Sequence, residues 1–169
     1  SPDRRRQLLG PIAEQTLSLL KPMAAKKGVE LVFEPSTPLE ADVDVGLVQQ
    51  ALTNLIANGI QAMPNGGQLR LRLSRQRTTP PPELGGAEAN FALLEVQDDG
   101  VGIPADARSR IFEPFFTTKG IGEGTGLGLS VAYGIARDHG GWIGVTTEEA
   151  RGSCFSLYVP IERPATVSA

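Results

Sequence analysis

Hydrophobic and polar residues alternate with two different periods along the chain, and these periods predict where helices and strands lie. Apolar residues recur at helical spacing over residues 4–27, 44–63 and 125–139, which predicts three helices. The middle segment has the clearest apolar stripe, and Asp44 fits the N-cap position at its start. Segments rich in Pro and Gly separate these runs, so we expect the helices to be distinct elements.

A period of two residues predicts strands in other segments. Leu69, Leu71 and Leu73 alternate with polar residues, which indicates a half-buried strand. The remaining expected elements are strands over 29–33, 91–96, 142–147 and 153–159, a loose hairpin loop over 76–90, a short helix over 104–111 and a loop over 112–124. Cys154 falls in the last strand and is interpreted as a strand residue rather than a nucleophile.

The mixture of elements predicts an α+β fold, with a mixed sheet covered by helices on one face. The 169 residues are 40% hydrophobic and 21% charged, as in ordinary globular domains. A net charge of −3 and the lack of a long basic stripe argue against a nucleic-acid partner. With no run of 18 apolar residues and a single cysteine, we expect a cytoplasmic domain without direct membrane contact.

The helix expected over residues 44–63 has a polar face made of amides rather than charged side chains. Gln50, Asn54, Asn58 and Gln61 lie within about 80° of one another on a helical projection. Amide oxygens are neutral hard ligands that suit Mg²⁺. By itself this row fits two interpretations, a metal site or amides that only face water.

A strand ends in two acids, Asp98 and Asp99, and then Gly100 and Gly102 follow. Glycine permits a close approach of the backbone to a ligand. A carboxylate at a strand end can accept a hydrogen bond from an exocyclic amine such as that of adenine, which contributes about 1.5–3 kcal/mol. The same four residues also fit a plain turn.

Glycine occupies every second position from Gly120 to Gly128, directly before the third helix. Free N–H groups at a helix start favour a phosphate, and Lys119 stands just before the glycines. The Walker ending Gly-Lys-Ser/Thr is missing, so this is not a P-loop, and a plain flexible loop is the alternative. Residues 100–105 also match the dinucleotide-binding motif G-x-G-x-x-A, but Pro104 leaves little room for the long helix that this motif needs.

Taken in this order, the segments resemble the nucleotide-binding domain of sensor histidine kinases, within the wider GHKL superfamily of gyrase-like, Hsp90-like and MutL-like ATPases. The N box looks like residues 50–59, the G1 box like 98–104, the F box like 111–119 and the G2 box like 124–129. The forms Asn58–Pro64 and Phe115–Lys119 look most like the nitrogen-regulation and dicarboxylate-sensor branch.

The resemblance implies a two-layer α/β sandwich of the Bergerat type, with ATP between the N-box helix and a lid over residues 105–126. It implies that Asn58 binds Mg²⁺, that Asn54 and Lys119 act with it in catalysis, and that Asp98 accepts from the adenine amine. The other residues expected to contact the nucleotide are Gln61, Gly100, Gly102, Ile103, Phe112, Thr117, Thr118, Gly124, Thr125, Gly126, Leu127, Gly128, Leu129 and Ser153.

The same resemblance implies a histidine kinase that transfers the ATP γ-phosphoryl group to a histidine on a separate helical domain, which then serves a response regulator. We expect residues 1–11 to be the remnant of the linker from that helical dimerisation domain. Residues 12–161 would be the catalytic domain and 162–169 a tail, in a parent that can be anchored in the inner membrane. The only histidine, His139, is expected to close a helix rather than to accept phosphate.

Two positions depart from the family pattern. Gln61 stands where many members carry Lys or Arg, so Lys119 is expected to meet the phosphate charge. Gly59 stands where Ala is commoner and should cost about 1 kcal/mol of helix stability.

Two alternative functions stay open, an ATP-gated binding module and a serine kinase of the anti-sigma type. Because the amide of Asn54 cannot act as a general base, we expect slow ATP hydrolysis.

Overall fold

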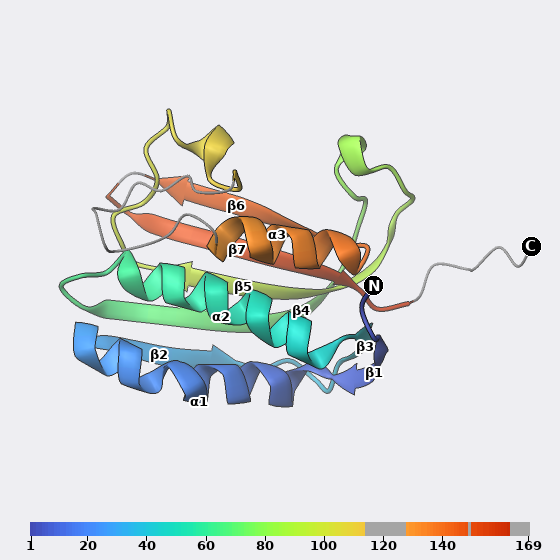
Figure 1. The fold of residues 1–169 in the computed structure, drawn as a ribbon, viewed down its shortest axis with the longest axis horizontal. Helices are drawn as coiled ribbons and strands as arrows, with labels where there is room; N and C mark the ends of the chain where they lie inside the picture. The colour runs from blue at the N-terminus through green and yellow to red at the C-terminus, as the bar shows by residue number, and fades with distance from the viewer. Residues whose placement is uncertain (114–127, 149, 163–169) are drawn as a thin grey trace, which may run out of the picture.

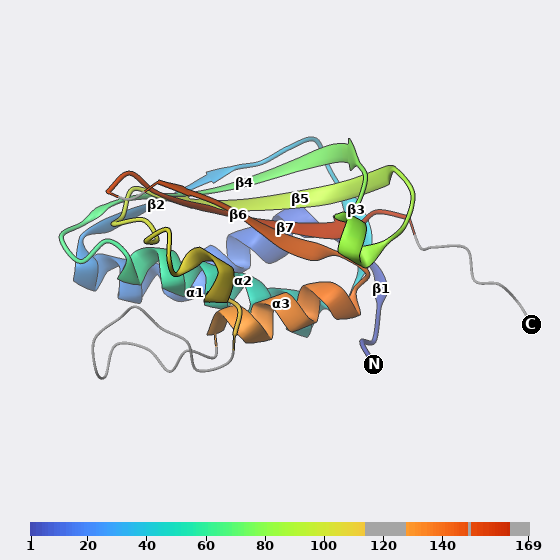
Figure 2. The ribbon, with the colours of Figure 1, turned by 90° about the horizontal axis from the view of Figure 1, so that it is seen from above.

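Three helices lie side by side against one face of a five-stranded sheet (Figures 1 and 2). The computed structural model describes residues 1–113, 128–148 and 150–162. The helices are α1 (Leu9–Lys27), α2 (Val45–Gln61) and α3 (Gly128–Asp138), with two short 3₁₀ turns, η1 (Pro82–Leu84) and η2 (Arg108–Arg110). The strands are β1 (Arg5–Leu8), β2 (Val29–Glu34), β3 (Glu40–Val43), β4 (Gly67–Thr78), β5 (Ala89–Asp98), β6 (Trp142–Glu148) and β7 (Gly152–Pro160).

The large sheet has the order β2-β4-β5-β7-β6. Strand β2 pairs with β4 in parallel, and every other neighbouring pair in this sheet is antiparallel. In the register of the three central strands, Asp98 at the end of β5 stands opposite Leu69 of β4 and Ser153 of β7. The last residue of β5 therefore lies in the middle of the sheet, with a strand on each side.

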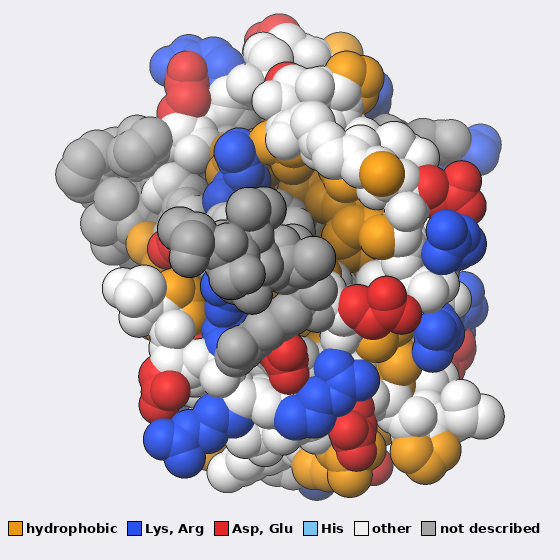
Figure 3. Space-filling view, turned by 90° about the vertical axis from the view of Figure 1, so that its right-hand side faces the viewer, with side chains coloured by type: hydrophobic (Ala, Val, Ile, Leu, Met, Phe, Trp, Pro, Cys, Tyr) orange, Lys and Arg blue, Asp and Glu red, His pale blue; other side chains and the backbone are white. Residues whose placement is uncertain are grey.

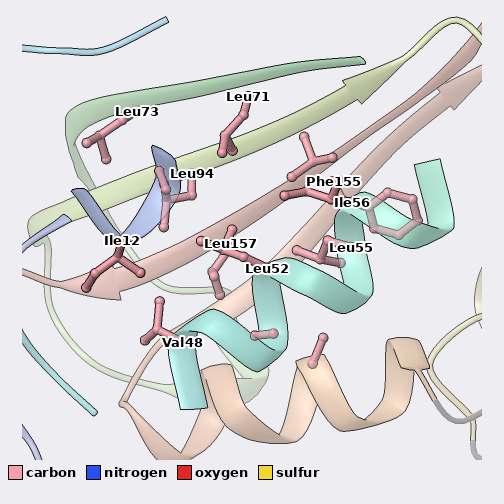
Figure 4. Close-up of a cluster of buried hydrophobic side chains, with 14 of the residues drawn as sticks. Ile12, Val48, Leu52, Leu55, Ile56, Leu71, Leu73, Leu94, Phe155 and Leu157 are labelled. Atoms are coloured by element: carbon pink, nitrogen blue, oxygen red, sulfur yellow. The ribbon is translucent and has the colours of Figure 1, made fainter. Parts of the chain in front are cut away.

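The core fills the space between α2 and the central strands (Figure 4). Helix α2 lies between α1 and α3, and its apolar face is fully buried. The largest fully buried side chains include Leu52, Leu55, Ile56, Leu71, Leu94, Phe155 and Leu157. Burying each such side chain contributes about 1.5–3 kcal/mol, so α2 is held firmly on the sheet.

The mixed sheet with helices on one face confirms the α+β prediction. Helix α2 begins as expected, because the Asp44 carboxylate accepts a hydrogen bond from the Leu47 N–H at 3.2 Å. The strand assignment of Cys154 is also confirmed, since it lies in β7. Strands β4 and β5 are longer than predicted and leave only 79–88 as the loop between them.

The prediction of one helix over residues 4–27 is wrong at its start. Residues Arg5–Leu8 form β1 and pair antiparallel with β3, a strand that the sequence analysis did not predict. Pro11 then stands in the first turn of α1, where the missing N–H costs no helical hydrogen bond. The segment 104–111 contains only the 3₁₀ turn η2 rather than a short α-helix.

The end of the molecule that holds β1 and β3 carries acidic and basic side chains side by side (Figure 3). Arg6 pairs with Glu40 at 3.2 Å, and its guanidinium also donates to the Ile161 carbonyl oxygen at 2.6 Å. This arginine therefore ties the first strand to the end of β7. None of the helices within the described ranges is long and apolar enough to cross a membrane.

Candidate nucleotide-binding site

Asp98 is a buried carboxylate at the end of the central strand β5, with only 2% of its surface exposed. Its Oδ1 accepts hydrogen bonds from the backbone N–H of Gly100 at 2.8 Å and of Ser153 at 3.3 Å. Burial raises the pKa of Asp98 above that of an ordinary carboxyl, and the charge of Asp99 adds to this, while the two backbone donors oppose it.

The second carboxylate oxygen, Oδ2, has no hydrogen-bond donor among the residues that the structure describes. It faces α2 at Gly59, where an added Cβ would lie 3.6 Å away. A buried carboxylate is costly unless donors satisfy it, so this oxygen is suited to a donor from a ligand.

Gly59 lets α2 approach the sheet at this point. A Cβ there would lie 2.7 Å from the Leu69 Cδ1 atom, closer than real Cβ contacts. A larger residue at this position would therefore require the Leu69 side chain to shift, while its Cβ would be in ordinary contact with Asp98.

The G1 segment crosses directly over the end of α2. A Cβ on Gly100 would collide with the Ala62 carbonyl oxygen, and the same oxygen accepts from the Val101 N–H at 3.2 Å. Gly102 has a φ of +74°, which favours glycine. The structure thus gives both glycines a role in the path of the chain, whereas the predicted approach of the base to them stays a prediction.

Thr147 connects the G1 segment to β7, and sequence reasoning missed it. Its Oγ1 accepts from the Ile103 N–H at 2.9 Å and lies 2.8 Å from the Ser153 Oγ. The backbone N–H of Ser153 supports Asp98 while its hydroxyl is tied to Thr147. The sequence marked Thr147 only as the end of a predicted strand, and it is the pairing of β6 with β7 that sets it opposite Ser153.

The amide row of α2 meets the start of α3. Asn54 donates from Nδ2 to the carbonyl oxygen of Gly128 at 3.0 Å. Asn58 and Gln61 are half-buried further along α2, whereas Gln50 is exposed. The structure thus brings the N box next to the first described residue of the G2 box, and Asn58 follows Asn54 by about one turn, roughly 6 Å.

Phe112 and Leu129 pack against the core. The Phe112 ring lies 4.9 Å from the Tyr133 ring on α3 and 6.4 Å, edge-on, from the Phe155 ring on β7. Phe112 therefore anchors the start of the F box on the sandwich. Sequence reasoning did not single out Tyr133, its partner.

Seven predicted site residues lie outside the described residues: Thr117, Thr118, Lys119, Gly124, Thr125, Gly126 and Leu127. Most of the predicted lid, 105–126, lies there as well. Within the described ranges, no three His, Cys, Asp or Glu side chains are grouped to hold a metal ion. The predicted metal ligand, Asn58, is instead an amide, a ligand type that suits a cation with several waters.

His139 is buried and closes α3, as predicted. Its backbone N–H donates to the carbonyls of Ile135 and Ala136, and its ring Nδ1 lies 2.9 Å from the Ile135 oxygen. Its other ring nitrogen, Nε2, accepts from the backbone N–H of Asp44 at 3.1 Å. Both ring nitrogens are therefore occupied by backbone groups.

Together, the central buried carboxylate, the glycine segment over a helix end and the adjacent amide row form the candidate nucleotide site on a two-layer sandwich. The chain belongs to the family described as histidine kinase-, DNA gyrase B- and HSP90-like ATPase, which matches residues 43–163.

Its relatives are sensor kinases. Sensor kinase CckA of Brucella abortus is 39% identical in an alignment of 166 positions that covers 92% of this chain and 18% of that protein. Sensor histidine kinase ZraS of Escherichia coli K12 is 36% identical over 90% of this chain and 30% of that protein. The chain thus spans about a fifth to a third of the length of these relatives.

Solved histidine kinase structures share the fold. Full-length ShkA in complex with AMPPNP matches 98% of this chain and 33% of its own, with a TM-score of 0.78 and 28% identity. The nucleotide-free catalytic domain of ThkA matches 94% of this chain and 96% of its own, with a TM-score of 0.76 and 28% identity. The predicted two-layer α/β sandwich is therefore confirmed as that of histidine kinase catalytic domains.

Proposed function

We propose that this chain binds ATP as the catalytic domain of a sensor histidine kinase and transfers the γ-phosphoryl group to a histidine on a helical domain of the parent protein. The observation that carries this proposal is the buried Asp98 at the end of a central strand, whose Oδ2 has no donor from residues 1–113, 128–148 and 150–162. Residues 12–161 would be the catalytic domain, 1–11 a linker remnant and 162–169 a tail.

The adenine base would bind at Asp98. Its exocyclic amine would donate to Oδ2, beside the point where Gly100 lets the G1 segment pass close over the end of α2. Guanine carries a carbonyl oxygen in place of that amine and would face the carboxylate with an acceptor. Because two acceptors repel, the site favours adenine nucleotides over guanine nucleotides.

The phosphates would lie along Asn54 and Asn58 of the amide row and the start of α3, away from the exposed Gln50. Asn58 would be the protein ligand of Mg²⁺, and Asn54 would bind phosphate or metal-bound water. When bound, Mg²⁺ neutralises charge that develops on the phosphate oxygens. Lys119, together with Gly126 and Gly128, would complete the phosphate contacts, with Gln61 beside them on α2.

The acceptor histidine would come from outside this chain. His139 has both ring nitrogens occupied and is 1% exposed. An imidazole nitrogen of the helical domain would attack the γ-phosphorus, and the bond to the bridging oxygen would break, leaving ADP. The amide of Asn54 cannot deprotonate water, so transfer is favoured over hydrolysis. The response regulator would then receive the phosphoryl group from that helical domain.

The nucleotide assignment is tested by titrating the chain with a non-hydrolysable ATP analogue, with and without Mg²⁺. Asn58→Ala should weaken only the Mg²⁺-dependent part of the affinity. Gln50→Ala is the matched control, because this amide lies on the same helix but is exposed. If the parent, Asn58→Ala and Gln50→Ala bind the analogue equally well, both with and without Mg²⁺, then Asn58 is not the metal ligand.

Phosphoryl transfer is tested by mixing the chain with the helical domain of its parent protein and labelled ATP. An acid-labile, base-stable phosphohistidine on the helical domain supports the proposal. An acid-stable phosphoserine would instead indicate a serine kinase. ATP-dependent association of two copies without any transfer would indicate an ATP-gated binding module.

A further inference from the structure

Asp44 connects three parts of the chain at the end of the molecule remote from Asp98. Its Oδ1 accepts from the Leu47 N–H and caps α2, and its Oδ2 accepts from the Asp3 N–H at 3.0 Å. Its backbone N–H donates to His139 at the end of α3. The pKa of Asp44 is lowered by these backbone donors, first that of Asp3 and then that of Leu47, so the carboxylate form is favoured.

The bond between Asp44 and His139 fixes the tautomer of the histidine. A backbone N–H can only donate, so Nε2 must be the acceptor and the ring proton lies on Nδ1. Nδ1–H then donates to the Ile135 carbonyl oxygen, which belongs to α3 itself. The His139 ring thus joins the last turn of α3 to the N-cap of α2.

A second bond joins the same two helices near the nucleotide site. Asn54 donates to Gly128, the first residue of α3, and a Cβ on Gly128 would lie 3.8 Å from the Asn54 Cβ. Helices α2 and α3 run antiparallel and side by side (Figure 1), so the two bonds lie at opposite ends of α3.

The spacing of the two bonds matches along the two helices. Asn54 follows Asp44 by ten residues, and His139 follows Gly128 by eleven. At 1.5 Å per residue these intervals are about 15 Å and about 16 Å. If α3 slid along α2 by one turn, both bonds would break. Each bond therefore helps to fix the position of α3 along α2 that the other bond requires.

From this geometry we propose that His139 is a positioning residue for the phosphate part of the nucleotide site. It fixes α3 on α2 and thereby sets the start of α3 against Asn54, without touching the nucleotide itself. The inference rests on the proposed function, because it takes the start of α3 as the place where phosphates bind. Adenine binds on the other side of α2 at Asp98, which His139 does not hold.

The test compares the affinities of the 169-residue chain for adenosine and for a magnesium-bound, non-hydrolysable ATP analogue by calorimetry. The ratio of the two affinities measures the phosphate contribution. His139→Asn keeps an amide near the Ile135 oxygen but is too short to reach Asp44, and His139→Phe removes both bonds. Both variants lack the bond to Asp44, and each should lower the ratio roughly tenfold, with adenosine affinity within about twofold of the parent.

His139→Gln provides the conservative rescue, because its longer side chain can place an amide oxygen near the position of Nε2, and the ratio should return toward that of the parent. Thr16→Val is the matched control. Thr16 is equally buried and donates to the Ile12 carbonyl oxygen of its own helix at 2.7 Å, but it lies on α1. It should lower the midpoint of thermal unfolding and leave the ratio unchanged.

The outcomes separate this inference from the proposed function. If the parent chain binds neither ligand, the proposed function is wrong. If the parent binds both and the folded Asn and Phe variants keep the parent ratio, the positioning role is wrong. A purely structural role is indicated if the ratio falls as much in Thr16→Val as in the His139 variants. Should one His139 variant fail to fold, the other decides by the same ratio.

Discussion

The Asp98 carboxylate turns back on its own chain and accepts the N–H of Gly100, two residues ahead, at 2.8 Å. One oxygen thus closes the turn after β5, while the other is left for a ligand on the side of α2. A single side chain therefore shapes the G1 segment and, in the proposed function, would offer the acceptor for the adenine amine.

Asp98→Asn should separate these two roles. The Asn oxygen can still accept from Gly100 and Ser153, so the turn should persist, and removing a buried charge should leave the free energy of unfolding equal or higher. The amide NH₂ group would face the adenine amine with a donor. Loss of a charge-assisted bond of about 1.5–3 kcal/mol predicts roughly 10- to 100-fold weaker binding of adenine nucleotides.

Calorimetric titration and urea unfolding measure the two effects. Asp99→Asn is the control, because Asp99 is exposed and its side chain has no part in this turn. It should bind adenine nucleotides like the parent. Retained affinity in Asp98→Asn would place the base elsewhere.

The raised pKa of Asp98 predicts a pH dependence of its own. The folded chain holds the Asp98 proton more tightly than the unfolded chain does, because burial disfavours the carboxylate. Between the ordinary carboxyl pKa and the raised value, the native state binds more protons, so this group makes the free energy of unfolding fall as pH rises. Asp98→Asn should remove that slope in urea unfolding measured across this range.

Nucleotide binding should show the opposite trend. The adenine amine needs the carboxylate form, so affinity should weaken as pH falls through the raised pKa of Asp98, and binding within that range should release a proton. Calorimetry in buffers of different ionisation enthalpy measures the released proton. A proton release of the same size in Asp98→Asn would assign it to another group.

The sequence predicted the parts of this fold that strong local patterns encode. Helix α2 was predictable from its apolar stripe and from Asp44, and the antiparallel strands from their alternation. Strand β1 was not, because Leu8 and Leu9 continue an apolar stripe in the sequence. Its strand conformation depends on pairing with β3, more than 30 residues away in the chain.

The site was predictable as a set of motifs but not as a set of contacts. Asp98, Gly100 and the amide row are marked by residue type. The contributions of Thr147 and Tyr133 arise only when β6 and α3 dock, and neither residue type indicates nucleotide chemistry. The role of Gly59 was likewise hidden, because the atom it avoids belongs to Leu69 on a separate strand.

Gly100→Ala should disturb the adenine site more than the fold. The added Cβ would meet the Ala62 carbonyl oxygen, a backbone atom that cannot move aside without shifting the end of α2. We expect at least tenfold weaker nucleotide binding, roughly 1.4 kcal/mol.

Gly134→Ala is the matched control for Gly100→Ala. Its added Cβ would meet nothing within 4 Å, and it lies in the exposed part of α3. This change should raise helix stability by about 1 kcal/mol and leave nucleotide affinity unchanged. Calorimetry and thermal unfolding of both variants test the pair, and equal affinities would show that the G1 segment does not contact the base.

Thr147→Val should loosen the G1 segment without altering any residue assigned to the nucleotide. The valine has a similar shape but lacks the oxygen that accepts from Ile103 and contacts Ser153. The Ile103 N–H would lose its partner at a cost of about 1–3 kcal/mol. Because the lost bond joins the segment after Gly102 to β6, amide hydrogen exchange should become faster at Val101 and Ile103, and nucleotide affinity should fall severalfold.

Thr146→Val is the control within the same strand. Thr146 precedes Thr147 in β6, and its side chain is exposed on the opposite face of the sheet. It should leave both exchange and affinity like those of the parent. If Thr147→Val and Thr146→Val change exchange at residues 101 and 103 equally, the Thr147 hydroxyl does not hold this segment.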